Sequence, residues 1–336
     1  MLSHALRSCL LYVAQVIMFI FNWGGYVGNL VVLGNVLPDL MVGYFGEYEV
    51  FRRQIILVIA VVIFSPMAYY KGLGRFAWAS FLAVVAMIFV ILLVLYRYFF
   101  ERSTYQQPEP AHAFTFVNSN FLPVLGGISF IYTCQDMFFH VFHSLHDPTR
   151  KRVAIVAHSI MLSTMAILAS FGICGYFLFY QNVDDDILSN FGAKDQMIQV
   201  ARLMVAFNIV VSVPYCNFIP RVAVLAVVQM YFPQWAVKDV DNPQANRFKR
   251  NVVHFIVTTV LLGSGLVVAL FVTNLGVAFE FVGGISAVCI SLIIPPLCFL
   301  KLETDASRIK RASCYVVLLL GAVGTVGVIS KIAMNG

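Results

Sequence analysis

The stretch FAWASFLAVVAMIFVILLVLY, residues 76–96, decides the class of this protein. It has no charged residue, and nearly every side chain in it is apolar. A membrane-spanning α-helix needs about 20 such residues, because the hydrocarbon core of a bilayer is roughly 30 Å thick. The whole chain has the same character, with 60% hydrophobic and 11% charged residues, whereas soluble domains carry about 25% charged residues. We therefore predict an all-α polytopic membrane protein.

Eight further apolar stretches accompany residues 76–96. Two of them lie in the charge-free ranges 8–38 and 153–180. Between Arg250 and Lys301 the only charge is Glu280, so we divide that range into two helices joined by a tight turn at TNLG. About nine transmembrane helices are predicted, with eight or ten as the alternatives. They lie near 9–34, 54–70, 76–96, 119–144, 153–180, 197–220, 251–273, 277–300 and 312–331.

The loops predict the orientation, because cytoplasmic loops are enriched in Lys and Arg. With a cytoplasmic N-terminus, all but seven of the 22 basic residues fall on the cytoplasmic side. The seven on the opposite side are Arg52, Arg53, Arg97, Arg102, Lys194, Arg202 and Lys331. The net charge of +6 is therefore explained by membrane topology, and we expect a lipid bilayer and no nucleic acid as partner.

Glycine and proline interrupt several predicted helices. The fourth contains Gly126 and Gly127, and the sixth contains Pro214 and Pro220. Inside a membrane, backbone leaves helical geometry only where it lines a cavity or is buried in protein. Secondary transporters use such breaks to bind substrates and coupling ions. We therefore predict helix breaks in the fourth and sixth segments. The alternative is that the glycines only let helices pack closely.

An unusual acidic residue follows in the fourth segment. Asp136 lies in TCQDMFFH, residues 133–140, with His140 one helical turn later. An ionisable side chain near the bilayer centre costs about 2.5–3.5 kcal/mol on insertion scales, so it needs a cavity or a partner. Our hypothesis is that Asp136 and His140 adjust the dependence of the protein on a coupling ion or proton. The alternative is that the helix ends early and leaves both residues in a wet cytoplasmic vestibule.

Several stretches, in this order along the chain, resemble the sodium-coupled neutral amino acid transporters of the amino acid/auxin permease superfamily. YVGNLVVLGNVLPDL (26–40) is similar to that family's third helix, and FHSLHDPTRKR (142–152) to the link after its sixth. GICGYFLFYQNVDDDILSNF (172–191) resembles its seventh helix and outer loop. VARLMVAFNIVVSVPYCNFIPR (200–221) resembles its eighth, and GGISAVCISLIIPPLCFLKLE (283–303) its tenth.

The resemblance implies an inverted-repeat, LeuT-like amino acid permease fold that is incomplete here. The chain begins just before the family's third helix, and the family's broken first helix supplies half of the substrate and sodium site. We accordingly expect a chain truncated at its N-terminus relative to the family.

The resemblance also implies the site residues. Ser212 stands before Val213-Pro214, where relatives place a sodium-coordinating threonine, so Ser212 is the predicted sodium ligand and Asn208 a second ion-coupling candidate. The alternative for Ser212 is a hydroxyl bonded back to its own helix. The predicted amino acid pocket lies along the fourth segment and comprises Gly126, Gly127, Ser129, Thr133, Cys134 and Gln135. Relatives have a Cys-His pair where this chain has Cys134-Gln135.

The expected function is secondary active transport of amino acids, mainly neutral ones, coupled to sodium or protons, with no other cofactor. No phosphate-binding loop, nucleophile elbow or metalloprotease helix occurs, so an enzyme is not expected. The alternatives are a non-transporting amino acid sensor or regulator and a non-functional truncated isoform. The expected location is the plasma membrane or a lysosomal or other internal membrane.

Overall fold

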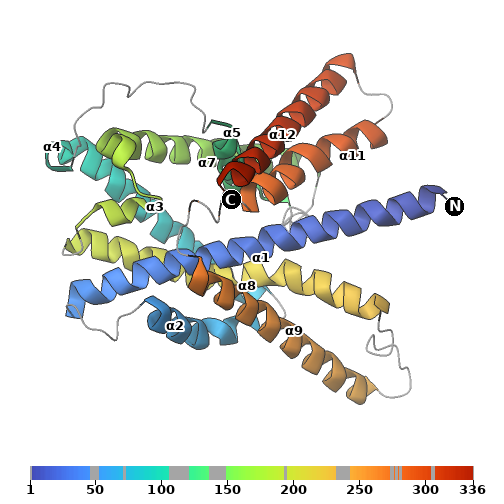
Figure 1. Cartoon of the computed structure of the whole chain (residues 1–336), viewed down its shortest axis with the longest axis horizontal. Helices are drawn as coiled ribbons and strands as arrows, with labels where there is room; N and C mark the ends of the chain where they lie inside the picture. Colours follow the sequence, from blue (N-terminus) through green and yellow to red (C-terminus); the bar gives the residue numbers. More distant parts are fainter. Residues whose placement is uncertain are drawn as a thin grey trace. The chain divides into compact units, whose positions relative to one another are not determined.

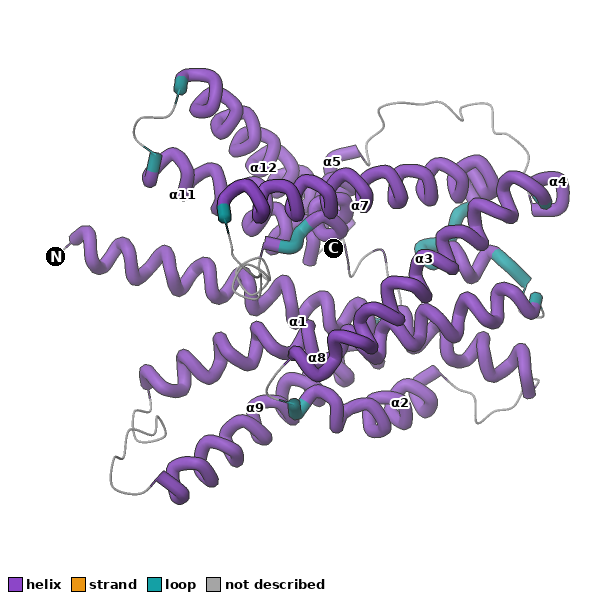
Figure 2. Tube along the Cα trace, turned by 180° about the vertical axis from the view of Figure 1, so that it is seen from behind, coloured by secondary structure: helices purple, strands orange, loops and turns teal. Residues whose placement is uncertain are grey.

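The structure, a computed structural model, is built from helices and short turns (Figures 1 and 2). None of the described residues forms a β-strand. The residues that the structure describes are 2–45, 53–70, 73–105, 121–135, 149–192, 195–231, 243–272, 276, 279, 282–303 and 307–335.

Within the described ranges, seven helical stretches are long and apolar enough to cross a membrane. They belong to α1 (Leu2–Phe45), α3 (Ala77–Phe100), α7 (Arg150–Phe179), α8 (Gln196–Tyr231), α9 (Pro243–Phe271), the run from η5 (Gly283–Ala287) through η6 (Cys289–Ile293) to α11 (Ile294–Leu302), and α12 (Arg308–Asn335). The remaining elements are shorter, namely α2 (Arg53–Ala68), η2 (Leu73–Phe76), α4 (Arg102–Tyr105), α5 (Phe121–Tyr132), η3 (Tyr180–Asn182) and η4 (Ile187–Asn190). A helix thus occupies each of the nine predicted segments, while seven of the nine reach spanning length in the described ranges.

The chain divides into two compact units, each made from two stretches of sequence. Unit 1 comprises Met1–Val90 and Phe191–Ala278, and unit 2 comprises Ile91–Asn190 and Phe279–Gly336. In unit 1, α1 runs along α8, and α9 and α2 pack beside them (Figure 1). The core of this unit lies along α1, where Tyr26, Leu30, Val31 and Leu33 are buried.

Two buried arginines on α8 join that helix to its neighbours in unit 1. Arg202 forms an ion pair with Asp39 of α1, with 3.4 Å between Nη2 and Oδ2. Arg221 donates from Nη1 to the carbonyl of Ala68 (2.8 Å) and from Nη2 to that of Tyr70 (3.2 Å). The final carbonyls of a helix lack partners within the helix, so Arg221 caps α2. Helix α1 continues past its predicted end at residue 34 to Phe45, and the pair with Arg202 compensates the charge of Asp39 within it.

The predicted break in the sixth segment is wrong, because α8 is one continuous helix that contains both Pro214 and Pro220. Each proline removes one backbone N–H and one hydrogen bond within the helix. Polar side chains on the same helix bond to nearby carbonyls. Ser212 Oγ donates to the Ile209 carbonyl (2.8 Å), and Asn217 Nδ2 donates to the Val213 carbonyl (3.0 Å). Packing against α1 on one side and α9 on another holds the helix together.

The predicted break in the fourth segment is present, and it follows the glycines by several residues. Helix α5 ends at Tyr132, and Thr133 and Cys134 are not helical. In unit 2, α5 packs against η5 and α12. A Cβ added to Gly126 would lie 2.7 Å from the Cα of Gly284, and one added to Gly283 would lie 2.5 Å from the carbonyl oxygen of Gly126, so the contact requires glycine on both elements.

The eighth segment stays helical but widens. Residues of η5 and η6, within 283–293, form two π-helical stretches, after which Pro295 and Pro296 open α11. These prolines have no N–H to donate to the carbonyls four residues earlier. In a π-helix each carbonyl instead accepts from the N–H group five residues later, and this pattern accommodates the loss. Two serines of this region bond back to the helix: Ser286 to the Val282 carbonyl, and Ser291 to the Ala287 carbonyl at 2.6 Å.

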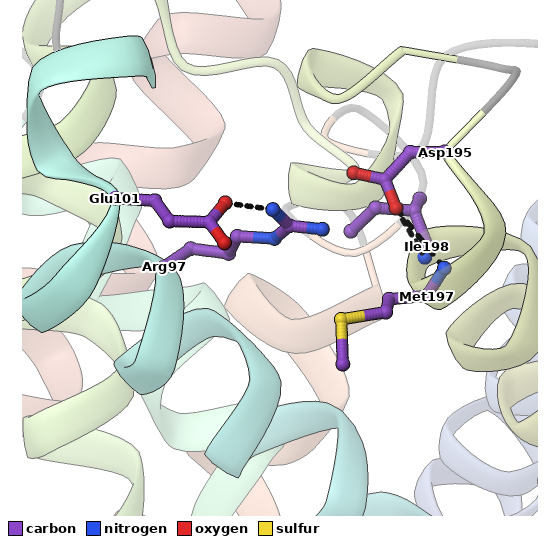
Figure 3. Close-up of polar contacts among 5 residues, drawn as sticks. All are labelled: Arg97, Glu101, Asp195, Met197 and Ile198. Atoms are coloured by element: carbon purple, nitrogen blue, oxygen red, sulfur yellow. Dashed lines mark hydrogen bonds and ion pairs between the residues drawn. The ribbon is translucent and has the colours of Figure 1, made fainter.

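Charged side chains also act at helix ends (Figure 3). In unit 2, Arg97 pairs with Glu101, one turn later at the end of α3. In unit 1, Asp195 caps the start of α8, where its Oδ1 accepts from the backbone N–H groups of Met197 (3.0 Å) and Ile198 (3.4 Å). The free N–H groups at a helix start make a carboxylate favourable there.

Candidate functional site

Ser212 lies halfway along the membrane-spanning part of α8. It follows the buried Arg202 by ten residues and precedes the buried Arg221 by nine. At about 1.5 Å per helical residue, each arginine is about 14–15 Å from Ser212 along the helix axis. The two arginines are thus separated by about the thickness of the hydrocarbon core. Ser212 therefore lies near the middle of the spanning stretch of α8, and secondary transporters bind substrates and coupling ions near the bilayer midplane.

Asn29 of α1 meets Ser212 at this depth. Its Nδ2 donates to Ser212 Oγ (3.2 Å) and also approaches Cys216 Sγ (3.6 Å), one turn later on α8. The hydroxyl of Ser212 donates in turn to the carbonyl of Ile209 (2.8 Å). All three side chains of this cluster, Asn29, Ser212 and Cys216, are half-buried. We call Asn29, Ser212 and Cys216 the midplane cluster.

The midplane cluster contains no carboxylate and no imidazole. Over its whole length α8 contains no Asp, Glu or His, and Asp39 is the only acidic residue of α1. Asp39 lies ten residues beyond Asn29 and is paired with Arg202. A serine hydroxyl has one hydrogen to donate and two lone pairs to accept with. Ser212 donates its hydrogen to the Ile209 carbonyl, and one of its lone pairs accepts from Asn29 Nδ2. The second lone pair can therefore bind a ligand.

The alternative predicted for Ser212, a hydroxyl bonded back to its own helix, is therefore present. That bond uses the hydroxyl hydrogen and leaves the oxygen able to accept. Asn208, the other predicted ion-coupling residue, lies one turn earlier on α8 and is half-buried. No hydrogen bond joins Asn208 to the midplane cluster among the described residues.

The predicted amino acid pocket corresponds to the end of α5 in unit 2. Thr133 Oγ1 donates to the Ser129 carbonyl (2.5 Å), and the Thr133 N–H donates to the Phe130 carbonyl (3.3 Å). The Cys134 N–H donates to the Gln135 side-chain oxygen (3.0 Å). Cys134 is exposed, while Ser129, Thr133 and Gln135 are half-buried. The polar groups of four predicted pocket residues thus gather where the helix stops.

The two predicted glycines have different surroundings. Gly126 is buried against Gly283 and Gly284, so its position serves helix packing. Gly127 is half-buried, and a Cβ added there would meet nothing within 4 Å. Asp136 and His140 lie outside the described residues, and their predicted role stays a prediction.

Asn29 is the polar residue that the sequence analysis did not select. It lies within YVGNLVVLGNVLPDL, which had been used only as a point of family resemblance. An amide inside a charge-free apolar span needs a partner, because an unsatisfied polar group in hydrocarbon is costly. The sequence alone therefore indicates that Asn29 has a partner. It does not indicate that the partner is Ser212, 183 residues away.

Comparison with known proteins places these features in a family. Residues 3–334 match the family described as transmembrane amino acid transporter protein. Sodium-coupled neutral amino acid transporter 7 of Homo sapiens is 24% identical over 322 residues, which are 92% of this chain and 67% of the relative. Vacuolar amino acid transporter 2 of Saccharomyces cerevisiae is 24% identical over 309 residues, with 90% and 63% covered.

A third relative shows a similar identity and coverage. Putative sodium-coupled neutral amino acid transporter 11 of Bos taurus is 24% identical over 315 residues, covering 92% of this chain and 64% of the relative. The chain spans about two thirds of the length of these relatives. Because the family match covers nearly the whole chain, this protein belongs to the transmembrane amino acid transporter family, a family of integral membrane transporters and not of enzymes.

Proposed function

We propose that this protein takes part in secondary active transport of neutral amino acids, with sodium as the coupling ion. The observation that carries the proposal is the contact between Asn29 and Ser212 at the middle of α8. Polar side chains inside membrane segments are costly unless they pair or face a cavity, and those that are kept commonly mark functional sites. The similarity to sodium-coupled neutral amino acid transporter 7 of Homo sapiens and to putative sodium-coupled neutral amino acid transporter 11 of Bos taurus supports the same proposal.

The chemistry of the midplane cluster favours sodium over a proton. A coupling proton needs a titratable group near neutral pH, and α8 offers no carboxylate or imidazole. Sodium needs oxygen ligands, which carbonyls and hydroxyls of interrupted membrane helices supply in secondary transporters. Ser212 offers a free lone pair. Pro214 cannot donate to the carbonyl of Val210, which leaves a backbone oxygen on the same turn of α8.

The end of α5 favours a neutral substrate. The pocket residues described there, including Ser129, Thr133 and Gln135, are all uncharged. A charged substrate side chain would therefore find no opposite charge among them. The last carbonyls of α5 carry partial negative charge, as at any helix C-terminus, and suit the ammonium group of an amino acid.

Uptake into proteoliposomes tests the proposal. Purified protein would be reconstituted, and entry of radiolabelled glutamine and leucine measured with an inward sodium gradient, with choline in place of sodium, and with an inward proton gradient. We expect uptake with the sodium gradient and little with choline. Uptake driven equally well by protons without sodium would overturn the choice of ion. Amino acid binding without any flux would overturn transport and favour a sensor.

The Ser212→Ala variant connects flux to the site. It should lower uptake at limiting sodium far more than at saturating sodium. Ser163→Ala is the matched control, because Ser163 is an exposed serine of α7 whose hydrogen bonds among the described residues are to the Ser159 and Ile160 carbonyls of its own helix. If Ser212→Ala and Ser163→Ala depended equally on sodium, Ser212 would not be a ligand of the coupling ion.

A further inference from the structure

We propose that Asn29 of α1 is an ion-site residue, which positions the Ser212 hydroxyl and supplies its own Oδ1 as a second oxygen ligand for a monovalent hard cation. This inference rests on the proposed function, because it assigns a residue to the same coupling-ion site. It adds a ligand from α1 that neither the family resemblance nor the sequence pattern indicated.

The first support is the set of unfilled acceptors. Both contacts of Asn29 with described residues use Nδ2, toward Ser212 (3.2 Å) and Cys216 (3.6 Å). Its Oδ1 has no donor among the described residues. Nδ2 and Oδ1 are attached to one carbon, so Oδ1 belongs to the same amide group that contacts the Ser212 oxygen. Two neutral oxygens from neighbouring helices, each with an acceptor position left open, are the kind of ligand that sodium takes.

The second support is the direction of the hydrogen bonds. With Asn29 donating, the Ser212 hydrogen turns away to the Ile209 carbonyl at 2.8 Å. A hydroxyl hydrogen directed at the cation would repel it, and this arrangement removes that hydrogen from the site. Asn29 therefore orients the Ser212 hydroxyl so that its oxygen can bind the cation. This effect does not depend on whether Asn29 Oδ1 also binds the cation.

The third support is the rigid attachment of α1 in unit 1. Trp23 Nε1 donates to Ser264 Oγ of α9 (3.2 Å), and the Tyr26 hydroxyl donates to the Leu262 carbonyl (3.4 Å). Beyond Asn29, Gln199 Nε2 donates to the Asp39 carbonyl (3.3 Å). Attachments on both sides of Asn29 fix its height and rotation relative to α8. Binding geometry of this kind depends on such supporting contacts.

The charges around the cluster agree with a site that binds one cation of single charge. The Asp39 carboxylate is ten residues away on α1 and paired with Arg202. A doubly charged cation would find no carboxylate in the midplane cluster to balance it, and such ions prefer carboxylate oxygens. The Cys216 sulfur is a soft ligand that suits copper or zinc better than sodium. We assign Cys216 no ligand role.

The test is the sodium dependence of uptake in Asn29→Ala and Asn29→Ser, in the same proteoliposomes. The matched control is Asn22→Ala, because Asn22 is a buried amide of α1 that donates to the Met18 carbonyl of its own helix (3.1 Å). We expect Asn29→Ala to raise the sodium concentration for half-maximal uptake about tenfold to a hundredfold, the usual effect of losing a group that orients or supports a metal ligand. At saturating sodium, the KM for the amino acid should change by less than about twofold. Asn29→Ser, which keeps a smaller oxygen, should fall between wild type and Asn29→Ala.

A binding measurement keeps the inference testable even without flux. Sodium chloride should raise the melting temperature of the purified wild-type protein and of Asn22→Ala above the value in choline chloride, because a ligand stabilises the state that it binds. Asn29→Ala should lose that increase. If Asn29→Ala cannot be purified folded, Asn29→Ser serves in the same measurement and should show a reduced increase.

The outcomes separate the two proposals. If wild-type protein shows neither sodium-dependent uptake nor sodium-dependent stabilisation, the proposed function fails. If the wild-type protein shows sodium dependence and Asn29→Ala matches Asn22→Ala in both measurements, the function stands and the assignment of Asn29 is overturned. If Asn29→Ala raises the amino acid KM at saturating sodium as strongly as the sodium requirement, Asn29 belongs to the substrate pocket and the ion assignment is also overturned.

Discussion

Gly126 of α5 and Gly284 of η5 approach so closely that a Cβ on Gly126 would lie 2.7 Å from the Gly284 Cα. Real side chains do not tolerate that distance from backbone, so one helix would have to move. The contact joins the helix that ends at the predicted pocket to the π-helical segment of unit 2. Small residues at such crossings let membrane helices pack at short distance.

Gly126→Ala should therefore destabilise unit 2. Overpacking of a tight contact costs about 1–3 kcal/mol, and the melting temperature in detergent should fall accordingly. Gly127→Ala is the neighbouring control, since a Cβ there meets nothing within 4 Å. Melting curves of the two variants measured by size-exclusion chromatography after heating would check this. Equal melting temperatures would mean that the glycine contact does not govern stability.

Loss of the Asp39 carboxylate should remove one ion-pair partner of Arg202 in the core of unit 1. Arg202 is 2% exposed, whereas Asp39 is 45% exposed and partly screened by its surroundings. Breaking a fully buried pair costs about 3–5 kcal/mol, and we expect about half of that for Asp39→Asn because of this exposure. A double-mutant cycle with Arg202→Met measures the coupling. If the effects of the two substitutions on the free energy of unfolding were additive, the Asp39–Arg202 pair would contribute nothing to stability.

Arg221→Lys should weaken the attachment of α2 to α8. The guanidinium reaches the Ala68 and Tyr70 carbonyls from two different nitrogens, and a lysine has one ammonium group for both. Losing one hydrogen bond to a charged group costs about 1.5–3 kcal/mol. Limited proteolysis between α2 and η2 should accelerate in the variant, with Lys310→Arg, in α12 of unit 2, as the control. Unchanged cleavage would show that the cap is dispensable.

Asp136→Asn tests the role that the sequence assigns to Asp136 and His140. If the two share a proton or adjust the coupling ion, we expect wild-type uptake to vary between about pH 5 and 8, where histidine titrates, and the variant to lose part of that variation. Uptake would be measured across that range at saturating sodium. Identical pH profiles of wild type and variant would exclude this role for Asp136.

The sequence predicted the class, the positions of the helical segments and the break after Tyr132, because each depends on local composition. Runs such as 76–96 require a membrane or a large core whatever packs around them. The continuity of α8 was not predictable in this way. Pro214 and Pro220 signal a break locally, while packing by α1 and α9, which comes from distant sequence, keeps the helix intact.

The site was predictable only in part, for the same reason. Ser212 was selected through family resemblance, and its neighbour Asn29 became visible only when α1 and α8 were seen together. Gly126 was assigned to the pocket as part of a glycine pair, and three-dimensional contacts separate the packing residue Gly126 from the more open Gly127. Pairing across 183 residues is a property of the tertiary structure that composition does not encode.

The central claim is that sodium and a neutral amino acid move together through a site that includes Ser212. The most direct test is entry of radioactive sodium into proteoliposomes on addition of external glutamine, at zero membrane potential. We predict that glutamine accelerates sodium entry in wild type and in Ser163→Ala, and much less in Ser212→Ala. Sodium entry that does not respond to glutamine, in protein that takes up glutamine, would contradict coupling.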